Sequence, residues 1–120
     1  MSDKATLTYL AKALELFGVY DGAMHLPTIL VFLTVANEPG IKKTELERRL
    51  GLSNSACSRH VMMLTKKGDF ARLGHVGHDL VFSETDPLDS RNKRVRLTKR
   101  GDALRDHLAL VLKRIKHDAN

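Results

Sequence analysis

The chain has 120 residues, of which 42% are hydrophobic and 28% charged, so we expect a single domain over residues 1–120 with a modest core. The absence of tryptophan and an aromatic content of 5% argue against a platform for stacking single-stranded bases. One cysteine excludes an internal disulfide and agrees with a reducing compartment. No leader follows Met1, and the longest apolar run, residues 29–33, is too short to cross a membrane, so we expect a cytoplasmic protein with no membrane partner.

The net charge of +6 is concentrated in two blocks of the sequence. Residues 41–72 carry a net charge of +5 and residues 91–120 carry +7, whereas residues 1–40 and 73–90 are net acidic. A solvated, lysine-rich surface is the simpler explanation of a basic composition. Both blocks coincide, however, with the elements described below that would face a polyanion, and this favours nucleic acid as the partner.

Two helices are expected before residue 40. Apolar residues at helical spacing predict the first over residues 7–17, which a glycine then ends. Asp21 and Gly22 mark a loop. Pro27 suits the first position of a second helix, which we expect to end near Ala36, before a chain break that contains proline and glycine.

A pair of helices joined by a tight turn follows. Thr44 and Glu47 have the spacing of a capping box at the start of the first, and Gly51 can end it. Ser53 can cap the second helix, which we expect to extend to about Lys67. This arrangement predicts a helix-turn-helix.

The second of these helices has two different faces. Cys57, Val61 and Leu64 form an apolar stripe that would face the core. The opposite face is small and polar at its beginning, which suits a helix end that enters the major groove of DNA. An amphipathic helix whose polar face only meets water is the alternative, and the capped helix before it and the basic hairpin after it favour DNA.

Short strands are expected at Phe70–Leu73, Leu80–Ser83 and Lys93–Leu97, with a turn over residues 74–79. A last helix begins near Lys99, and its apolar stripe is Leu104, Leu108, Val111 and Ile115.

The segment from Asp86 to Gly101, DPLDSRNKRVRLTKRG, is the most informative part of the chain. It opens with a turn of Asp, Pro, Asp and Ser, and then alternates basic and apolar residues as a half-buried strand does. Thr98 can cap the helix that follows, with Asp102 in its first turn. The pattern predicts a charged hairpin, braced on a helix, that presents cations to DNA.

This segment and SNSACSRHVMMLTKKGDFAR, which begins at Ser53, together resemble the MarR family of bacterial winged-helix transcription regulators. The resemblance extends from about Leu26 to Leu108. It implies a mainly α fold with a small antiparallel β-sheet (α+β), a winged helix-turn-helix with about five helices and a β-hairpin wing. It also implies a sequence-specific regulator of double-stranded DNA, which we expect to be a repressor.

The resemblance assigns roles to residues of this chain. Arg91 would enter the minor groove at the tip of the wing, and Asp89 would hold that arginine in place. The recognition helix would carry the major-groove contacts, and lysines around it would contact phosphates. The DNA-binding residues that we predict are Lys43, Ser53, Asn54, Ser55, Ser58, Arg59, Lys66, Asp89, Arg91, Lys93 and Arg94.

The family also implies a homodimer that binds a pseudo-palindrome. The chain has only 19 residues after Gly101, fewer than family members usually have, so we expect the helices within residues 1–25 and 99–120 to form the dimer. The dimer residues that we predict are Leu7, Leu10, Leu14, Leu104, Leu108, Val111 and Ile115. The stripe of the last helix could instead belong to the core, and we favour the dimer contact. Two further departures are Ser90, where many members have a second wing arginine, and an insertion between Arg72 and Asp86.

Other kinds of site have weaker support. His75, His78 and Asp79 have a spacing that could hold a metal, but exposed turn residues explain them better. Cys57 could sense oxidants, but its place on the apolar stripe indicates a small core residue. We find no nucleophile paired with a base and no phosphate-binding loop, so we expect neither enzymatic activity nor a cofactor.

Two other functions fit the same pattern: a winged-helix adaptor that binds proteins, and an architectural or replication-associated DNA binder with low specificity. The sequence does not identify the operator, the regulated genes or a small-molecule effector, and it does not distinguish repression from activation.

Overall fold

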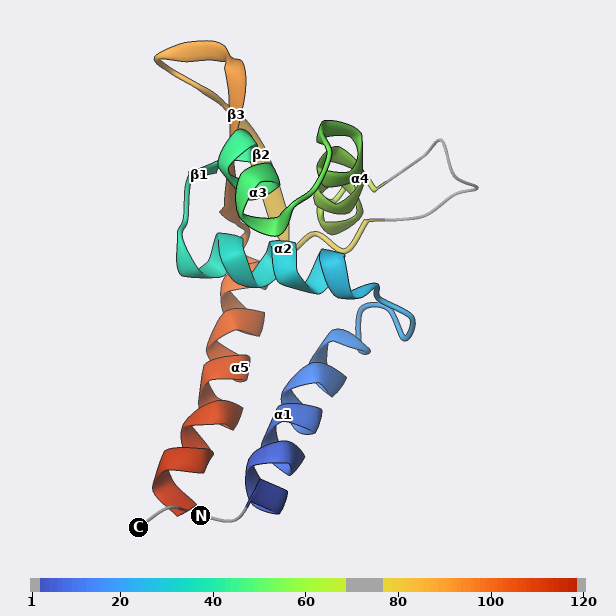
Figure 1. Ribbon diagram of the computed structural model, residues 1–120, viewed down its shortest axis with the longest axis vertical. Coiled ribbons are helices and arrows are strands. Elements are labelled where there is room, and N and C mark those ends of the chain that lie inside the picture. Colours follow the sequence, from blue (N-terminus) through green and yellow to red (C-terminus); the bar gives the residue numbers. More distant parts are fainter. Residues whose placement is uncertain (1–2, 69–76, 119–120) are drawn as a thin grey trace. The chain divides into compact units, whose positions relative to one another are not determined.

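The computed structural model describes residues 3–68 and 77–118 and contains five helices and three strands in these ranges (Figure 1). The order along the chain is α1 (Asp3–Phe17), α2 (Leu26–Asn37), β1 (Ile41–Lys42), α3 (Lys43–Leu50), α4 (Asn54–Leu64), β2 (Val81–Asp86), β3 (Asp89–Leu97) and α5 (Lys99–Asp118). The strands form one antiparallel sheet of order β1-β3-β2. The mainly helical winged-helix fold predicted from the sequence is confirmed.

The chain consists of two compact units. The larger unit, His25–Asp102, contains α2 to α4 and the sheet, and its core is formed where these helices pack on one another and on the sheet. The predicted stripe residues of α4, Cys57, Val61 and Leu64, are buried there, as are the side chains of Val31, Phe32, Val35, Ile41, Leu46, Val81 and Val95. Burial of about ten large apolar side chains is the main force that holds this unit together.

The helix-turn-helix follows the predicted pattern with two corrections. Gly51 ends α3 in the left-handed conformation (φ 63°), and the Ser53 hydroxyl accepts a hydrogen bond from the Ala56 N–H (3.1 Å), so both predicted caps are confirmed. The predicted capping box at Thr44 is wrong. Because β1 leads directly into α3, the helix begins at Lys43, and its N-cap, Lys42, makes no side-chain cap.

The other correction concerns the end of α4. The helix ends at Leu64, three residues before the predicted Lys67. Thr65 is extended (φ −79°, ψ 162°), and its hydroxyl donates to the Met62 carbonyl (2.7 Å), which closes the last turn. A threonine side chain that competes for a helical carbonyl in this way is a local stop signal.

The sheet is larger than the sequence predicted. The short strand β1 was not predicted, and it pairs with β3 through Ile41 and Val95. The hairpin strands β2 and β3 extend to a two-residue turn at Pro87 and Leu88. The predicted strand at residues 70–73 and the beginning of the predicted turn lie outside the described residues.

The junction between the hairpin and α5 is tightly packed. Thr98 caps α5 as predicted: its hydroxyl accepts from the Gly101 N–H (3.0 Å) and donates to the Asp79 carbonyl (2.7 Å). The Thr98 N–H donates to the Leu80 carbonyl (3.0 Å). Gly101 is buried so close to Leu80 that no side chain fits between them.

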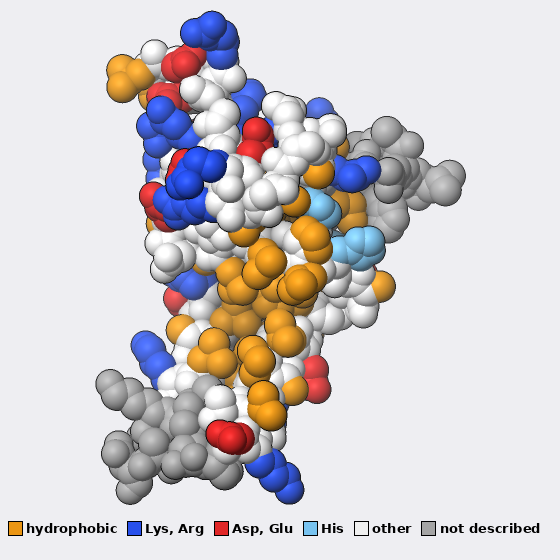
Figure 2. All heavy atoms as spheres, viewed as in Figure 1, with side chains coloured by type: hydrophobic (Ala, Val, Ile, Leu, Met, Phe, Trp, Pro, Cys, Tyr) orange, Lys and Arg blue, Asp and Glu red, His pale blue; other side chains and the backbone are white. Residues whose placement is uncertain are grey.

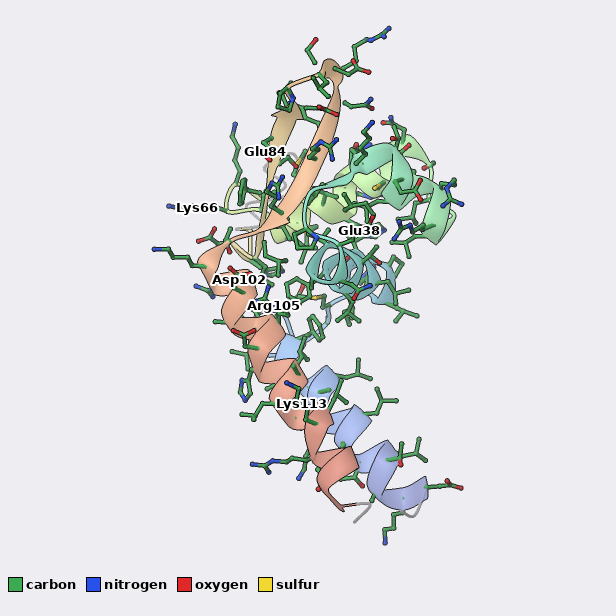
Figure 3. All side chains as sticks on the ribbon, turned by 90° about the vertical axis from the view of Figure 1, so that its left-hand side faces the viewer. Glu38, Lys66, Glu84, Asp102, Arg105 and Lys113 are labelled. Carbon is green, nitrogen blue, oxygen red and sulfur yellow. The ribbon has the colours of Figure 1, made fainter. Side chains whose placement is uncertain are left out.

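The smaller unit, Met1–Met24 with Ala103–Asn120, contains α1 and most of α5, which lie side by side (Figures 1 and 3). Of the predicted dimer residues, Leu104 and Leu108 are buried within the single chain and Val111 is half-buried, whereas Leu7, Leu10 and Leu14 are exposed. The side chain of Ile115 lies outside the described part of the chain. Gly18 lies just beyond α1, as predicted. In the described part of the chain, no helix combines the length and apolar character needed to span a membrane.

Gly101→Ala tests the junction. The added Cβ would lie 2.0 Å from the Leu80 carbonyl oxygen, so strand or helix must move. We expect the free energy of unfolding to fall by about 2 kcal/mol or more, because this overlap outweighs the roughly 1 kcal/mol that alanine gains over glycine in a helix. Chemical denaturation measures the difference.

Gly22→Ala is the matched control, because its Cβ would meet nothing within 4 Å. We expect its stability to stay within about 0.5 kcal/mol of wild type. Wild-type stability of Gly101→Ala would contradict the described packing.

Candidate nucleic-acid interface

The first two turns of α4 present a small polar surface to solvent. Asn54, Ser55 and Arg59 are exposed and Ser58 is half-buried, whereas Cys57 on the opposite side is fully buried. The side chains beside the Ser53 cap are short, so a duplex could approach the helix end closely. This is the geometry that a recognition helix requires.

The rotation of α4 is fixed by contacts on its flank. His60 shares a hydrogen bond with Thr28 of α2 (Nδ1 to Oγ1, 2.9 Å), and Thr28 is buried. Burial, followed by the positive charge of Arg59 and the neighbouring His25, lowers the pKa of His60 and favours its neutral form. The neutral imidazole therefore joins α4 to α2 without adding charge to the core.

The wing holds one arginine outward. The Asp89 carboxylate accepts from the Arg91 N–H (3.1 Å) and from Asn92 Nδ2 (3.0 Å), and it faces Arg91 Nε at 3.5 Å. The Arg91 side chain is nevertheless 91% exposed. Asp89 thus orients the backbone and side chain of Arg91 and leaves most of the guanidinium free for another anion.

The remaining predicted cations fall into two groups. Lys66 is exposed and points away from the sheet (Figure 3), and Lys93 is exposed with a long contact to the Thr85 hydroxyl (3.5 Å). Lys43 and Arg94 are instead held within the protein. Lys43 Nζ contacts Glu47 (2.6 Å) and the Asn54 carbonyl (3.3 Å), and its side chain is only 16% exposed.

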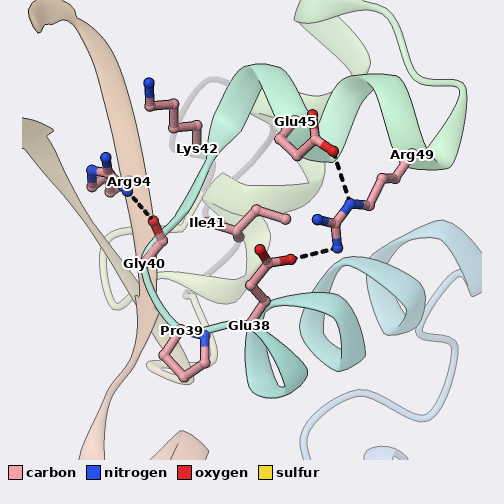
Figure 4. Close-up of a pocket in the computed structure, with 8 residues that line it drawn as sticks. All are labelled: Glu38, Pro39, Gly40, Ile41, Lys42, Glu45, Arg49 and Arg94. Carbon is pink, nitrogen blue, oxygen red and sulfur yellow. Dashed lines mark hydrogen bonds and ion pairs between the residues drawn. The ribbon is translucent and has the colours of Figure 1, made fainter.

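Arg94 has a structural role at the base of the wing. Its Nη1 donates to the Gly40 carbonyl (2.8 Å; Figure 4), and its Nη2 lies 3.3 Å from the Asp86 carboxylate. Both terminal nitrogens of this guanidinium are therefore engaged by the protein, and we leave Arg94 and Lys43 out of the contact surface that we propose below.

Asp86 is the residue that sequence reasoning missed. Its side chain is only 2% exposed; Oδ1 accepts from the Leu88 N–H (3.0 Å), and Oδ2 faces Arg94 and, at 3.9 Å, Lys42. The Leu88 N–H, together with Arg94 and Lys42, lowers the pKa of Asp86, although burial acts in the opposite direction. The only sequence signal was the Asp-Pro pair, which indicated a turn but not a buried carboxylate.

A pocket of about 370 Å³ lies beside this cluster, between β1, α3 and Arg94 (Figure 4). Its charged lining is already paired: Arg49 contacts Glu38 (2.5 Å) and Glu45 (3.0 Å). Hydrogen bonds from Arg48 and Arg49 lower the pKa of Glu45 to about 2. Glu38, Glu45 and Arg49 in the lining are therefore already engaged in ion pairs.

Lys and Arg side chains gather over α3 and along the wing on the face shown in Figure 2. Among the described residues, no three His, Cys, Asp or Glu side chains are placed to share a metal ion. His75 of the weak metal pattern lies outside those residues. Burial raises the pKa of the Cys57 thiol, which keeps it protonated and unreactive.

The fold and this surface define a winged helix-turn-helix protein. Residues 31–68 match the family model described as winged helix-turn-helix DNA-binding. A search of the curated proteins found no match to the sequence.

Several solved structures are similar to the chain. The PcaV transcriptional regulator from Streptomyces coelicolor, in complex with its natural ligand, has 24% identity and a TM-score of 0.59, over 89% of this chain and 72% of that one. MarR has 20% identity and a TM-score of 0.61, over 95% and 77%. A MepR mutant from S. aureus, bound to an oligodeoxyribonucleotide, has 15% identity and a TM-score of 0.68, over 93% and 73%. The expected resemblance to the MarR family is confirmed in the fold.

Asp86→Asn tests the buried cluster. We expect it to lower the unfolding midpoint at pH 7, because Arg94 and Lys42 lose their anion. Since the folded-state pKa lies below the ordinary 3.8, the stabilisation is present above pH 3.8 and is lost as the pH falls through the lower folded value. The difference from wild type should therefore shrink below about pH 4.

Thermal melts from pH 7 to acid measure this difference. Asp106→Asn is the matched control, because Asp106 is 71% exposed on α5 and should change the midpoint little. A melting curve of Asp86→Asn that coincides with wild type at pH 7 would refute the role of the cluster.

Proposed function

We propose that the chain is a MarR-type transcription regulator that binds a specific sequence of double-stranded DNA. One observation carries this proposal. The start of α4 is capped by Ser53, the backbone of Arg91 is held by Asp89, and the start of α4 and the wing lie toward the same end of one compact unit (Figure 1). A duplex against that end would meet the helix in its major groove and the wing in the adjacent minor groove.

Two similar structures support the choice of ligand. The MepR mutant is bound to an oligodeoxyribonucleotide, and reduced AbfR, which has a TM-score of 0.61 to this chain, is bound to DNA. In this chain the groove contacts would come from Ser53, Asn54, Ser55, Ser58, Arg59 and Arg91, and the phosphate contacts from Lys66 and Lys93.

Dimerisation and repression complete the proposal. The exposed leucines of α1, Leu7, Leu10 and Leu14, recur at helical spacing, and a second copy would bury them. A two-fold dimer would bind a pseudo-palindrome whose half-sites lie about 34–36 Å apart. Bound over a promoter, such a dimer would exclude polymerase, which makes a cytoplasmic repressor the function we expect. This role requires no catalytic residue.

Selection from random duplexes, followed by a salt titration, tests the function. We expect one sequence to be bound roughly a thousandfold more tightly than random DNA, with affinity falling steeply as salt rises. Equal affinity for all duplexes would indicate an architectural binder instead. No affinity for any duplex at low salt would indicate a protein-binding adaptor.

Arg91→Ala and Arg59→Ala test the two contact elements. We expect Arg59→Ala to cost about 1–3 kcal/mol of binding free energy and to relax preference at one base position, as a base contact should. Arg91→Ala should weaken binding and reduce its salt dependence. Fluorescence anisotropy with the selected site measures both.

Lys12→Ala is the control, because it removes one exposed positive charge from α1. If Arg91→Ala binds no more weakly than Lys12→Ala, the wing is not a contact element. A loss in Arg59→Ala that is the same for every sequence would mark a phosphate contact.

Leu10→Gln combined with Leu14→Gln tests the dimer. Both side chains are more than 40% exposed in the single chain, so the monomer should keep its fold while self-association weakens. We expect sedimentation equilibrium to show a shift from dimer to monomer. Val19→Gln, at an 80% exposed site beyond α1, should leave the dimer intact. Unchanged association of the double variant would exclude this surface.

A further inference from the structure

The outermost residue of the wing is hydrophobic. Leu88 occupies the two-residue turn between β2 and β3, and it is 94% exposed, the highest value among the exposed large hydrophobic side chains of the described chain. Figure 2 shows hydrophobic, acidic and Lys or Arg side chains close together where the wing ends. Two-residue hairpin turns favour Asn-Gly or Gly because their central residues adopt positive φ. Leu88 does not have a positive φ, since Asp79 is the only non-glycine residue with one among the described residues. The turn geometry therefore does not require a leucine.

Leu88 is nevertheless held firmly. Its N–H donates to Asp86 Oδ1 (3.0 Å), and Asp86 is itself buried against Arg94. Pro87 before it has a restricted backbone. The Leu88 side chain therefore adds almost no buried apolar area to the fold, although its backbone is anchored to the buried carboxylate of Asp86.

The surroundings of Leu88 indicate what it meets. Arg91, on the same hairpin, is 91% exposed, and the nearby Asp89 is occupied by Arg91 and Asn92. An exposed apolar side chain on an anchored backbone, on the same hairpin as an exposed guanidinium, is a combination with which minor-groove proteins separate stacked bases: the cation attracts the duplex, and the apolar group enters between two base pairs.

We propose that Leu88 is a wedge that enters a base step in the minor groove and partly unstacks it. This inference rests on the proposed DNA-binding function and adds a source of specificity to it. The cost of unstacking is lowest at flexible pyrimidine–purine steps, so the wing selects a deformable step without hydrogen-bonding its bases. The role belongs to this chain's own tip residue and is separate from the cation contact of Arg91.

The first test places 2-aminopurine at successive positions of the sequence flanking each half of the selected site. Its fluorescence rises when a neighbouring base unstacks. We expect a rise at one step per half-site with the wild type, and no rise with saturating Leu88→Ala. Leu110→Ala, a change at a leucine 62% exposed on α5, should behave as wild type. Melting curves of both variants should match wild type, because neither side chain is buried.

The second test replaces the flexible step with a stiff A-tract. Wild-type affinity should fall about fivefold, the size of a modest specificity contribution, and the affinity of Leu88→Ala should not change. Duplex binding without any 2-aminopurine response, and with equal step preference for wild type and Leu88→Ala, would overturn the wedge and leave the proposed function standing. Failure of the wild type to bind any duplex would overturn both.

Discussion

The buried carboxylate of Asp86 is the interaction on which the wing depends. A hairpin that projects from a small sheet has little apolar surface to keep it straight, and one charge-assisted cluster replaces that surface here. Asp86 connects the turn through Leu88, β3 through Arg94, and β1 through Lys42. Because Arg94 also holds the Gly40 carbonyl, the wing is fastened to the segment that leads into the helix-turn-helix. The wing and the helix-turn-helix, the two elements of the proposed DNA surface, are thus joined by hydrogen bonds and ion pairs.

The same cluster explains how a highly basic segment divides its charges. Arg94 and Arg96 lie on the face of β3 opposite the buried Val95 and Leu97, and they pair with Asp86 and Glu84, while Arg91 extends into solvent. Arg94 and Arg96 hold the wing in one geometry, and Arg91 remains available to contact a partner. A net charge alone would not reveal this division, since three arginines within six residues have the same charge and different partners.

Local signals in the sequence predicted much of this structure, and contacts between distant residues account for what it missed. Gly51, Ser53 and Thr98 were assigned correctly because each cap is formed by a side chain or backbone conformation within a few residues. The strand β1, the burial of Asp86 and the internal role of Arg94 could not be predicted in this way. They depend on pairing between segments such as Gly40 and Arg94, which are 54 positions apart. The early end of α4 depends on neighbouring residues only. It was missed because the Thr65 hydroxyl and the backbone N–H of a continuing helix can compete for the same carbonyl, and the apolar spacing does not show which of them donates to it.

The buried thiol of Cys57 offers a way to measure how often α4, the proposed recognition helix, separates from the core. It is the only cysteine in the sequence, it lies on the core side of α4, and it is inaccessible in the closed structure. An alkylating reagent can reach it only when α4 separates from the helices beneath it, so the rate of alkylation reports how often that opening occurs. A duplex that holds α4 in place would slow this reaction.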